Sequence, residues 1–348
     1  MTDVAREAGV SVSTASAVLG RKAHCYAAAS TKQQVFDAAK RVGYRPNLLA
    51  RGLRGEQTNM IGLVMYGLDR GAVPNAKLQS IEDAAWHHGY RLLIGTHKDE
   101  RARLEAYIDE FLDRAVDGLI FWPMLPEDGD LVEQALAGGT AVVTMEASRS
   151  FPAPDVAIDR ERGARLQVEH LLQIGRRRPA FLLTSHHGHL GQAKVRGLEG
   201  ALADHGLSLS QFPVLEMPRP HGVAAAGAQL TEQLLREGHD FDSIVTLSDD
   251  VALPAIATLL RHGRRVPEDV AVVGFDDEHA PEGMVVPLTT ISQPRDIGPI
   301  IFEQLLKNIR AENQDETAPA RIRLAPSLII RESTVPGAGV GRSASDNE

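Results

Sequence analysis

The spacing of apolar positions changes near residue 58, and the change divides the chain into two regions. Beyond that point, short apolar runs alternate with helical stretches, and the runs predict strands. These runs are MIGLVM (60–65), YRLLIG (90–95), GLIFWP (118–123), TAVVTM (140–145), VAI (156–158), PAFLLT (179–184), SIVTL (243–247) and VAVVGF (270–275). Continuous apolar strands separated by helices predict parallel sheets covered on both faces. The number of such units, roughly ten, predicts two doubly wound lobes with ligand faces at the carboxyl ends of their strands.

Before residue 58, the apolar positions lie three and four residues apart, which predicts a small bundle of helices. Gly9 ends a first helix, and Ser11 caps a second helix over 12–19 after a very short turn. Two short helices joined in this way are typical of the helix-turn-helix motif. The outer face of the second helix carries small hydroxyl and methyl groups, which let a helix lie deep in the major groove of DNA. The predicted DNA-facing residues are Val12, Ser13, Thr14, Ser16 and Ala17.

A third helix is predicted over about 31–42, and Pro46 disfavours helix immediately after it. The basic segment that follows, LLARGLR (48–54), is too short to form a stable helix alone in water. A helix that forms only on DNA and wedges Leu53 into the minor groove would explain this composition. A plain linker would explain it as well, and periodicity does not decide between the two.

Composition is that of a globular protein without a membrane span. The chain has 348 residues, enough for two or three domains, with 43% hydrophobic and 24% charged residues. It contains no apolar run long enough for a transmembrane helix, and residues 1–20 lack the apolar core of a signal peptide. The single cysteine, Cys25, excludes an internal disulfide and fits a reducing compartment, so we expect the cytoplasm.

Charge is unevenly distributed along the chain. Residues 1–54 carry nine basic and three acidic side chains, a net +6, which leaves −15 for the remainder of a chain whose formal net charge is −9. A basic region attached to an acidic body is typical of a protein that docks one end on phosphates. Charge alone is equally compatible with a solvated N-terminal bundle.

The segments DVAREAGVSVSTASAVL (3–19) and STKQQVFDAAKRVGYRPNLLARGLR (30–54) resemble the DNA-binding head of the LacI/GalR regulators. The resemblance implies that the second helix reads the major groove and that a hinge helix enters the minor groove through Asn47, Ala50 and Leu53. It also implies a two-lobed, periplasmic-binding-protein-like body that closes on a small ligand. The predicted fold class is therefore α/β, with doubly wound parallel sheets preceded by a small all-α helix-turn-helix domain.

Two features of the head depart from the family pattern. Ala17 stands where the family usually has Arg, the commonest reader of guanine. We therefore expect an atypical half-site, contacted at this position only through a methyl group. The loop over 20–30 is also longer than the family usually shows.

Polar residues that follow strands are the candidates for effector binding. Arg196, in AKVRGLEG, and Asp276, in VVGFDDE, resemble the family's effector positions. A guanidinium with a carboxylate suits a polyhydroxylated ligand such as a sugar, although the two could also form an ion pair without a ligand. Further candidates are Asp159, Asp249, Ser248 and His187. The S-H-H-G-H cluster that contains His187 has no second group at metal-ligand spacing, so no metal is predicted.

The sequence predicts four segments with different roles. They are a helix-turn-helix domain (1–45), a hinge helix and linker (46–58), a two-lobed effector-binding and dimerisation domain (59–333) and a disordered tail (334–348). The first lobe is predicted to contain about 60–160 and 292–318, and the second about 161–290 and 321–333. The tail has no heptad leucines, which favours a homodimer on a palindromic operator over a tetramer.

Together these patterns predict a sequence-specific transcriptional regulator, which in this family is usually a repressor. Its expected partners are a double-stranded DNA operator, a sugar-like effector and a second copy of the chain, with no cofactor and no membrane. One rival is a sugar-binding protein of the periplasmic type, which would have no use for residues 1–55. The other is an enzyme, but the sequence has no Walker A element, dinucleotide fingerprint or nucleophile elbow, so we do not expect one.

Overall fold

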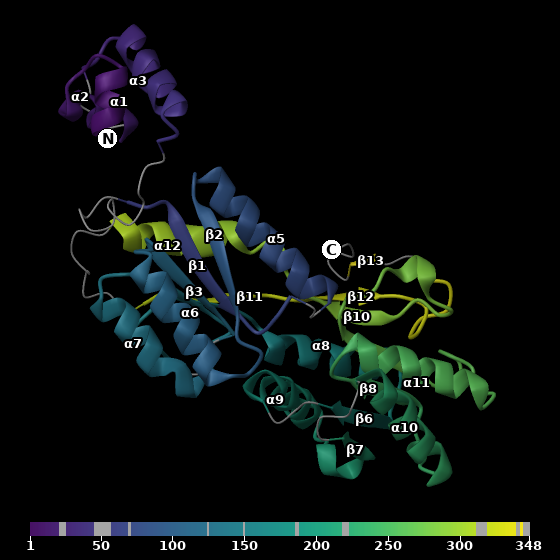
Figure 1. The fold of residues 1–348 in the computed structure, drawn as a ribbon. Helices are drawn as coiled ribbons and strands as arrows, with labels where there is room; N and C mark the ends of the chain where they lie inside the picture. The colour runs from purple at the N-terminus through teal and green to yellow at the C-terminus, as the bar shows by residue number, and fades with distance from the viewer. Residues whose placement is uncertain are drawn as a thin grey trace. The chain divides into compact units, whose positions relative to one another are not determined.

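The computed structural model divides into two compact units, Met1–Thr58 and Asn59–Glu348, and each is described by itself (Figure 1). The structure describes residues 1–20, 26–44, 57–68, 71–123, 125–148, 150–184, 188–217, 223–310, 319–338 and 342–343. None of the helices in these ranges has both the length and the apolar content needed to cross a membrane. We call the first unit the head and the second unit the body.

The head is a three-helix bundle closed around a small apolar core. Its helices are α1 (Thr2–Glu7), α2 (Val12–Leu19) and α3 (Ala29–Arg41). The core consists of Val4, Ala5, Ala15, Val18, Val35, Ala38 and Ala39, with Ala8, Val10 and Leu19 at its margin. Gly9 adopts a φ of 65° in the turn between α1 and α2, a conformation that residues with a Cβ disfavour. The helix-turn-helix predicted from the sequence is confirmed.

Two polar contacts fix the ends of these helices. Ser11 Oγ accepts a hydrogen bond from the Thr14 amide at 3.0 Å and so caps α2, as predicted. Arg41 Nε lies 2.9 Å from Glu7 Oε1 and ties the end of α3 to the end of α1. The start of α2 is therefore fixed by its cap, and α1 and α3 are joined at their ends as well as through the core.

The first sheet of the body has six parallel strands in the order β11-β5-β4-β3-β1-β2. The strands are β1 (Met60–Met65), β2 (Arg91–Thr96), β3 (Gly118–Trp122), β4 (Ala141–Met145), β5 (Asp155–Ile158) and β11 (Arg321–Leu324). Helices α5 (Ala72–His87) and α12 (Gly298–Arg310) pack on one face, and α6 (Arg101–Asp113) and α7 (Gly129–Ala137) pack on the other (Figure 1). Because both faces are covered, the central strands are apolar throughout rather than alternating.

The second sheet has seven strands in the order β13-β12-β10-β9-β8-β6-β7. The strands are β6 (Pro179–Thr184), β7 (Val214–Met217), β8 (Ser243–Thr246), β9 (Ala271–Asp276), β10 (Thr289–Ser292), β12 (Ser327–Ile330) and β13 (Arg342–Ser343), of which the last two are antiparallel to their neighbours. Helices α8 (Arg160–Gln173) and α9 (His189–Asp204) cover one face, and α10 (Val223–Arg236) and α11 (Asp249–Arg261) cover the other. Short 3-10 helices over Pro126–Asp128, Leu209–Gln211 and Pro281–Gly283 lie in the connections. Two mostly parallel, doubly covered sheets confirm the predicted fold class.

We call each sheet with its covering helices a lobe. The chain crosses between the lobes three times, between β5 and α8, between β10 and α12, and between β11 and β12. The prediction placed 321–333 in the second lobe, and this is wrong for Arg321–Leu324, which pair with β5 in the first sheet. The strand extends the free edge of that sheet, so the last crossing comes only after Leu324.

The predicted disordered tail does not begin at residue 334. Thr334 is 3% exposed, and its Oγ1 lies 2.8 Å from His170 Nε2 and 2.7 Å from Thr289 Oγ1. Further along, Arg342–Ser343 pair with β12 as a short edge strand. These contacts hold Thr334 and Arg342–Ser343 against the second sheet, which the Gly- and Ser-rich composition of the tail did not predict.

The helix pairs on the second sheet pack with their backbones in close contact. A Cβ placed on Gly197 in α9 would lie 2.2 Å from the carbonyl oxygen of Glu161 in α8. On the opposite face, a Cβ on Gly227 in α10 would lie 2.3 Å from the carbonyl oxygen of Val251 in α11. Since backbone atoms cannot swing aside as a side chain can, glycine is required at both contacts.

We expect the substitution Gly197→Ala to lower the melting temperature of the protein. The added methyl group must push α8 and α9 apart, and overpacking of this kind costs about 1–3 kcal/mol. That cost exceeds the gain of up to about 1 kcal/mol that alanine brings to a helix interior. Thermal unfolding followed by circular dichroism measures the difference.

Gly200→Ala is the matched control for this experiment. It lies one turn further along the same helix, and its Cβ would meet only Nη1 of the Arg165 side chain, at 2.7 Å. A long side chain can move away, so G200A is expected to retain or raise the melting temperature. Equal stability of the two variants would contradict the requirement for glycine at position 197.

Candidate functional site

The outer face of α2 is the candidate DNA-binding surface. Val12 is 46% exposed, Ser13 is exposed, and Thr14, Ser16 and Ala17 are half-buried at the helix surface. Ser11 Oγ lies 2.8 Å from both Ser13 Oγ and Thr14 Oγ1, so these hydroxyl groups form one cluster at the start of the helix. The helix carries no charged side chain, so its backbone can approach a partner closely. The other predicted contact residues, Asn47, Ala50 and Leu53, lie outside the described residues.

In the body, two carboxylates meet at the carboxyl ends of β8 and β9. Asp249 is 1% exposed, and it accepts hydrogen bonds from Thr290 Oγ1 at 2.6 Å and from the Glu278 amide at 2.8 Å. Burial, reinforced by the negative charge of Asp276, raises the pKa of Asp249 to about 8. Asp249 is therefore mostly protonated at neutral pH, and Asp276 carries the negative charge of the pair.

Asp276 itself has an unusual backbone. Its φ is 116°, a region that residues other than glycine rarely adopt and that costs on the order of 1–3 kcal/mol. The strain is held in place by contacts of the carboxylate, whose Oδ1 accepts a hydrogen bond from Gln293 Nε2 at 2.5 Å and lies 3.5 Å from Lys194 Nζ. Strained backbone at the end of a strand is typical of binding sites in doubly wound folds.

Lys194 is the cation that accompanies Asp276. It projects from α9, donates to the carbonyl oxygen of Leu247 at 2.6 Å and lies 3.7 Å from the centre of the Phe275 ring. Burial lowers the pKa of Lys194, and the charge of Asp276 opposes that change. The ammonium group is thus fixed by a carboxylate, a carbonyl group and an aromatic face.

A second buried lysine reaches the same place from the other lobe. Lys77, in α5, is 3% exposed and donates to Gln293 Oε1 at 2.9 Å. Because the same carboxamide binds Asp276, the contacts run from Lys77 through Gln293 and Asp276 to Lys194. This chain of contacts, which we call the polar junction, joins α5 of the first lobe to β9 and α9 of the second.

A hollow of about 300 Å³ lies beside the start of α8 and α9. Glu146, after β4, forms a buried ion pair with Arg160, and His189 Nε2 lies 2.8 Å from the Glu146 carbonyl oxygen. Asp159 and Arg196 also line the hollow. Since its walls come from both lobes, a ligand held there would contact both.

The residues predicted for effector binding are brought together only in part. Asp276, Asp249 and Ser248 gather near the polar junction, whereas Asp159 and Arg196 line the hollow. Arg196 does not pair with Asp276, since its Nε lies 3.4 Å from Glu161 Oε2 on an exposed surface. His187 lies outside the described residues.

Sequence reasoning missed Lys77, Lys194 and Gln293. Lys194 stands only two residues before Arg196 in the segment AKVRGLEG, so the sequence indicated the right segment but not the side chain that reaches Asp276. For Lys77, a lysine in an amphipathic helix is ordinarily solvated, and only the crossing of the chain at Gln293 shows that it is buried.

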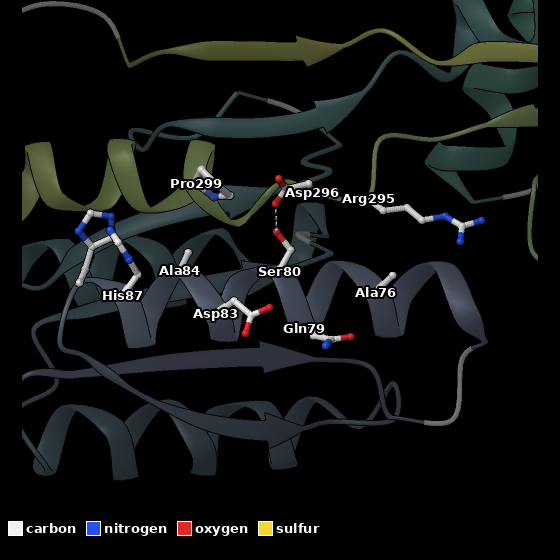
Figure 2. A pocket seen from close by; sticks show the side chains of 10 residues that line it. Ala76, Gln79, Ser80, Asp83, Ala84, His87, Arg295, Asp296 and Pro299 are labelled. Carbon is white, nitrogen blue, oxygen red and sulfur yellow. Dashed lines mark hydrogen bonds between the residues drawn. The ribbon is translucent and has the colours of Figure 1, made fainter. Parts of the chain in front are cut away.

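A larger hollow, of about 740 Å³, lies between α5 and the start of α12 (Figure 2). Ser80 Oγ donates to Asp296 Oδ1 at 2.6 Å across it, as Figure 2 shows, and accepts from the Gly298 amide at 2.8 Å. None of the residues predicted for effector binding lines this hollow. Within the described ranges, no group of three or more His, Cys, Asp or Glu side chains is placed to hold a metal ion.

Comparison with known proteins agrees with both units. Residues 1–47 match the model of the bacterial regulatory proteins of the lacI family, and residues 168–334 match a periplasmic binding protein-like domain. The lactose operon repressor of Escherichia coli (strain K12) is 30% identical over 96% of this chain and 90% of its own length. The chain belongs to the LacI family. A further family member, the regulator AscG of the same organism, is 31% identical over 80% of this chain and 82% of its own.

Solved structures of LacI-family proteins have the same architecture. The lac repressor dimer bound to operator and the anti-inducer ONPF superimposes with a TM-score of 0.81 at 27% identity, covering 95% of this chain and 98% of that one. A complex of the transcriptional regulator CelR with cellobiose gives a TM-score of 0.67 at 25% identity, over 95% and 98% of the two chains. These relatives are all transcriptional regulators.

We expect Asp249→Asn to weaken the dependence of stability on pH. The folded protein holds a proton on Asp249 up to pH 8, whereas the unfolded chain releases it near the ordinary value of 3.8. The stabilising contribution of this proton is complete below pH 4 and is lost as pH rises towards 8, by at most about 1.4 kcal/mol for each pH unit. Urea unfolding of wild type and D249N between pH 5 and 8 measures this change.

Asp240→Asn is the control, because Asp240 is 74% exposed in the same lobe. Its substitution should leave the pH profile unchanged. If D249N follows the wild-type profile, Asp249 is ionised in the folded protein and the assignment of charge to Asp276 alone is wrong.

Proposed function

We propose that the protein is a repressor that binds a palindromic DNA operator as a homodimer and is controlled by a small polar effector bound between its lobes. The observation that carries the DNA-binding part is the uncharged outer face of α2, capped by Ser11, in a region (1–54) of net charge +6. In such an arrangement short side chains read base edges, while basic groups around them bind phosphates. We expect such a protein to act in the cytoplasm.

Within the head, Val12, Ser13, Thr14, Ser16 and Ala17 are the proposed base-reading and groove-contacting residues. The segment 46–58 is proposed as a hinge, with Asn47, Ala50 and Leu53 entering the minor groove. The related lac repressor binds its operator as a dimer, which supports a dimer on DNA for this chain as well. A two-fold symmetric dimer requires two half-sites related by the same symmetry.

The effector site is proposed to lie between the lobes, at the polar junction and the adjoining hollow. Its members are Lys194, Asp276 and Gln293, with Asp159, Arg196, Ser248, Asp249 and His187 as further candidates. Related structures hold cellobiose or ONPG, which supports a ligand with several hydroxyl groups. Ammonium and carboxylate groups side by side offer such a ligand both donors and acceptors.

Coupling between DNA and effector follows from the polar junction. A ligand that replaces the hydrogen bonds of Gln293 or Asp276 removes a contact between α5 and the second lobe. If one arrangement of the lobes favours DNA binding, effector and operator must alter each other's affinity by the same factor.

The two rival functions have less support. A sugar-binding protein without a regulatory role would leave the match of residues 1–47 to the lacI-family head unexplained. An enzyme would need a reaction centre, and the relatives of this chain named above are regulators of transcription.

The proposal predicts that the purified protein enriches a palindrome from a random library of DNA duplexes at moderate salt. Phosphate contacts alone would give uniform, strongly salt-dependent binding. Ala17→Arg should shift the enriched half-site towards guanine at one position, with discrimination of about 1–3 kcal/mol, because arginine donates two hydrogen bonds to guanine.

Ala28→Arg is the control, since it adds the same charge to an exposed position of the head outside α2. It should strengthen binding to all sequences without changing base preference. Uniform binding by wild type would refute the proposed operator recognition, and an unchanged half-site in A17R would refute the role given to position 17.

A further inference from the structure

The buried ammonium group of Lys77 lacks a counter-charge of its own. Its hydrogen-bond acceptor is the neutral carboxamide of Gln293, at 2.9 Å, and among the described residues it makes no ion pair with a carboxylate. Burial lowers the pKa of Lys77 to about 8, so at neutral pH most molecules still carry the charge. A buried charge without a partner is unfavourable, and proteins ordinarily pair such groups.

The acidic residues near Lys77 already have other partners or are protonated. Glu146 forms its ion pair with Arg160, and both side chains are buried. Asp276 lies beside Lys194 and also accepts from Gln293. Asp249 is mostly protonated at neutral pH, as described above. Glu278, which reaches the start of α5, accepts from the Val73 amide at 3.1 Å. Among the described residues, none of these four acids forms an ion pair with Lys77.

A second observation also indicates a missing partner. Ser248 Oγ is buried and has no hydrogen-bond partner in the described part of the chain. Ser248 precedes the first residue of α11, and its side chain does not cap that helix. It directly follows Leu247, whose carbonyl oxygen accepts from Lys194. Next to Lys194 there are thus an unpaired hydroxyl group and the positive end of a helix, and both favour a ligand oxygen.

We propose that the effector of this protein carries an anionic oxyacid group, a carboxylate or a phosphate, which pairs with Lys77 between the lobes. The inference rests on the proposed function, since it names the chemical class of the effector that controls DNA binding. The remaining polar groups, Asp276, Lys194 and Ser248, suit hydroxyl groups on the same ligand. A sugar acid or a sugar phosphate has both kinds of group, whereas a neutral sugar leaves Lys77 without a counter-charge.

The pairing also explains how a ligand would act on both lobes. Lys77 belongs to α5 in the first lobe, and Lys194 and Ser248 belong to the second. Lys77 is 3% exposed, so the lobes must separate for a ligand to reach it. An anion bound to Lys77 would replace the Gln293 carboxamide and so change the contact that holds α5 to Asp276.

The first test measures binding of inorganic phosphate and of acetate to the full chain. These probes carry the two acid groups without a carbon skeleton that a particular site would have to fit. Melting temperature is recorded against anion concentration, with sodium chloride added to keep ionic strength constant. We expect saturable stabilisation of wild type by at least one probe, and at least a tenfold weaker response in K77M.

Lys307→Met is the matched control, because Lys307 is 62% exposed on α12 of the same lobe and pairs with Glu303. Its response to the anions should equal that of wild type. A response to phosphate alone assigns a phosphorylated effector, and a response to acetate assigns a carboxylate. No saturable response in wild type, or an equal response in K77M, overturns the proposal.

The second test needs no ligand. If Lys77 gains an ionic partner only when an anion binds, a variant without the Lys77 charge should melt in chloride buffer at or above the wild-type temperature. Lys77→Gln, which keeps a polar group near Gln293, repeats the measurement with a second neutral side chain. A fall in melting temperature for both variants would show that the charge is satisfied within the protein, and would overturn the proposal.

These outcomes are separate from those of operator selection. A protein that enriches a palindrome but ignores both anions is still a regulator, and its effector is neutral. If the protein binds anions through Lys77 but selects no DNA sequence, the proposed ligand class is supported and the proposed regulatory role is contradicted.

Discussion

The carboxylate of Asp276 is one of the points at which polar contacts join the two lobes of the body. It receives Gln293 from one of the three crossings and lies beside Lys194 on α9, and Gln293 in turn binds Lys77 on α5. Burial raises the pKa of the neighbouring Asp249, and the charge of Asp276 raises it further. Residues from five separate segments meet there because the carboxyl ends of parallel strands share one edge of a sheet.

This geometry explains which parts of the site the sequence could predict. The rule that ligand groups follow strands located Ser248, Asp249 and Asp276, since each comes directly after an apolar run. Lys77 is different, because nothing in the pattern of a surface helix distinguishes a buried lysine from a solvated one. Its burial arises from the second crossing of the chain, which brings Gln293 over α5. Arg196 was proposed because its segment follows a strand and resembles the family's effector position, although the residue that reaches the carboxylate is Lys194.

The fold was predictable to the extent that its strands are continuously apolar. The eight strands proposed from apolar runs all exist, with ends shifted by a residue or so, whereas β7, β10, β11, β12 and β13 were not foreseen as strands. In β11, exposed residues alternate with half-buried ones, as expected for a strand at the edge of a sheet. In β10, three of the four residues are Thr or Ser. Two of them, Thr289 and Thr290, are buried, and Asp249, Arg331 and Ser333 provide their hydrogen-bond partners. Tertiary contacts of this kind leave no periodic trace in the sequence.

The glycine contacts at positions 197 and 227 have a mechanical consequence. Each face of the second sheet is covered by two helices whose main chains touch, and such helices cannot slide past each other without losing the contact. The second lobe should therefore resist internal deformation, and the three connections to the first lobe are the places where the body can bend more readily. We expect a molecule bound between the lobes to act mainly by turning one lobe against the other, since the helices of the second lobe cannot slide to absorb the change.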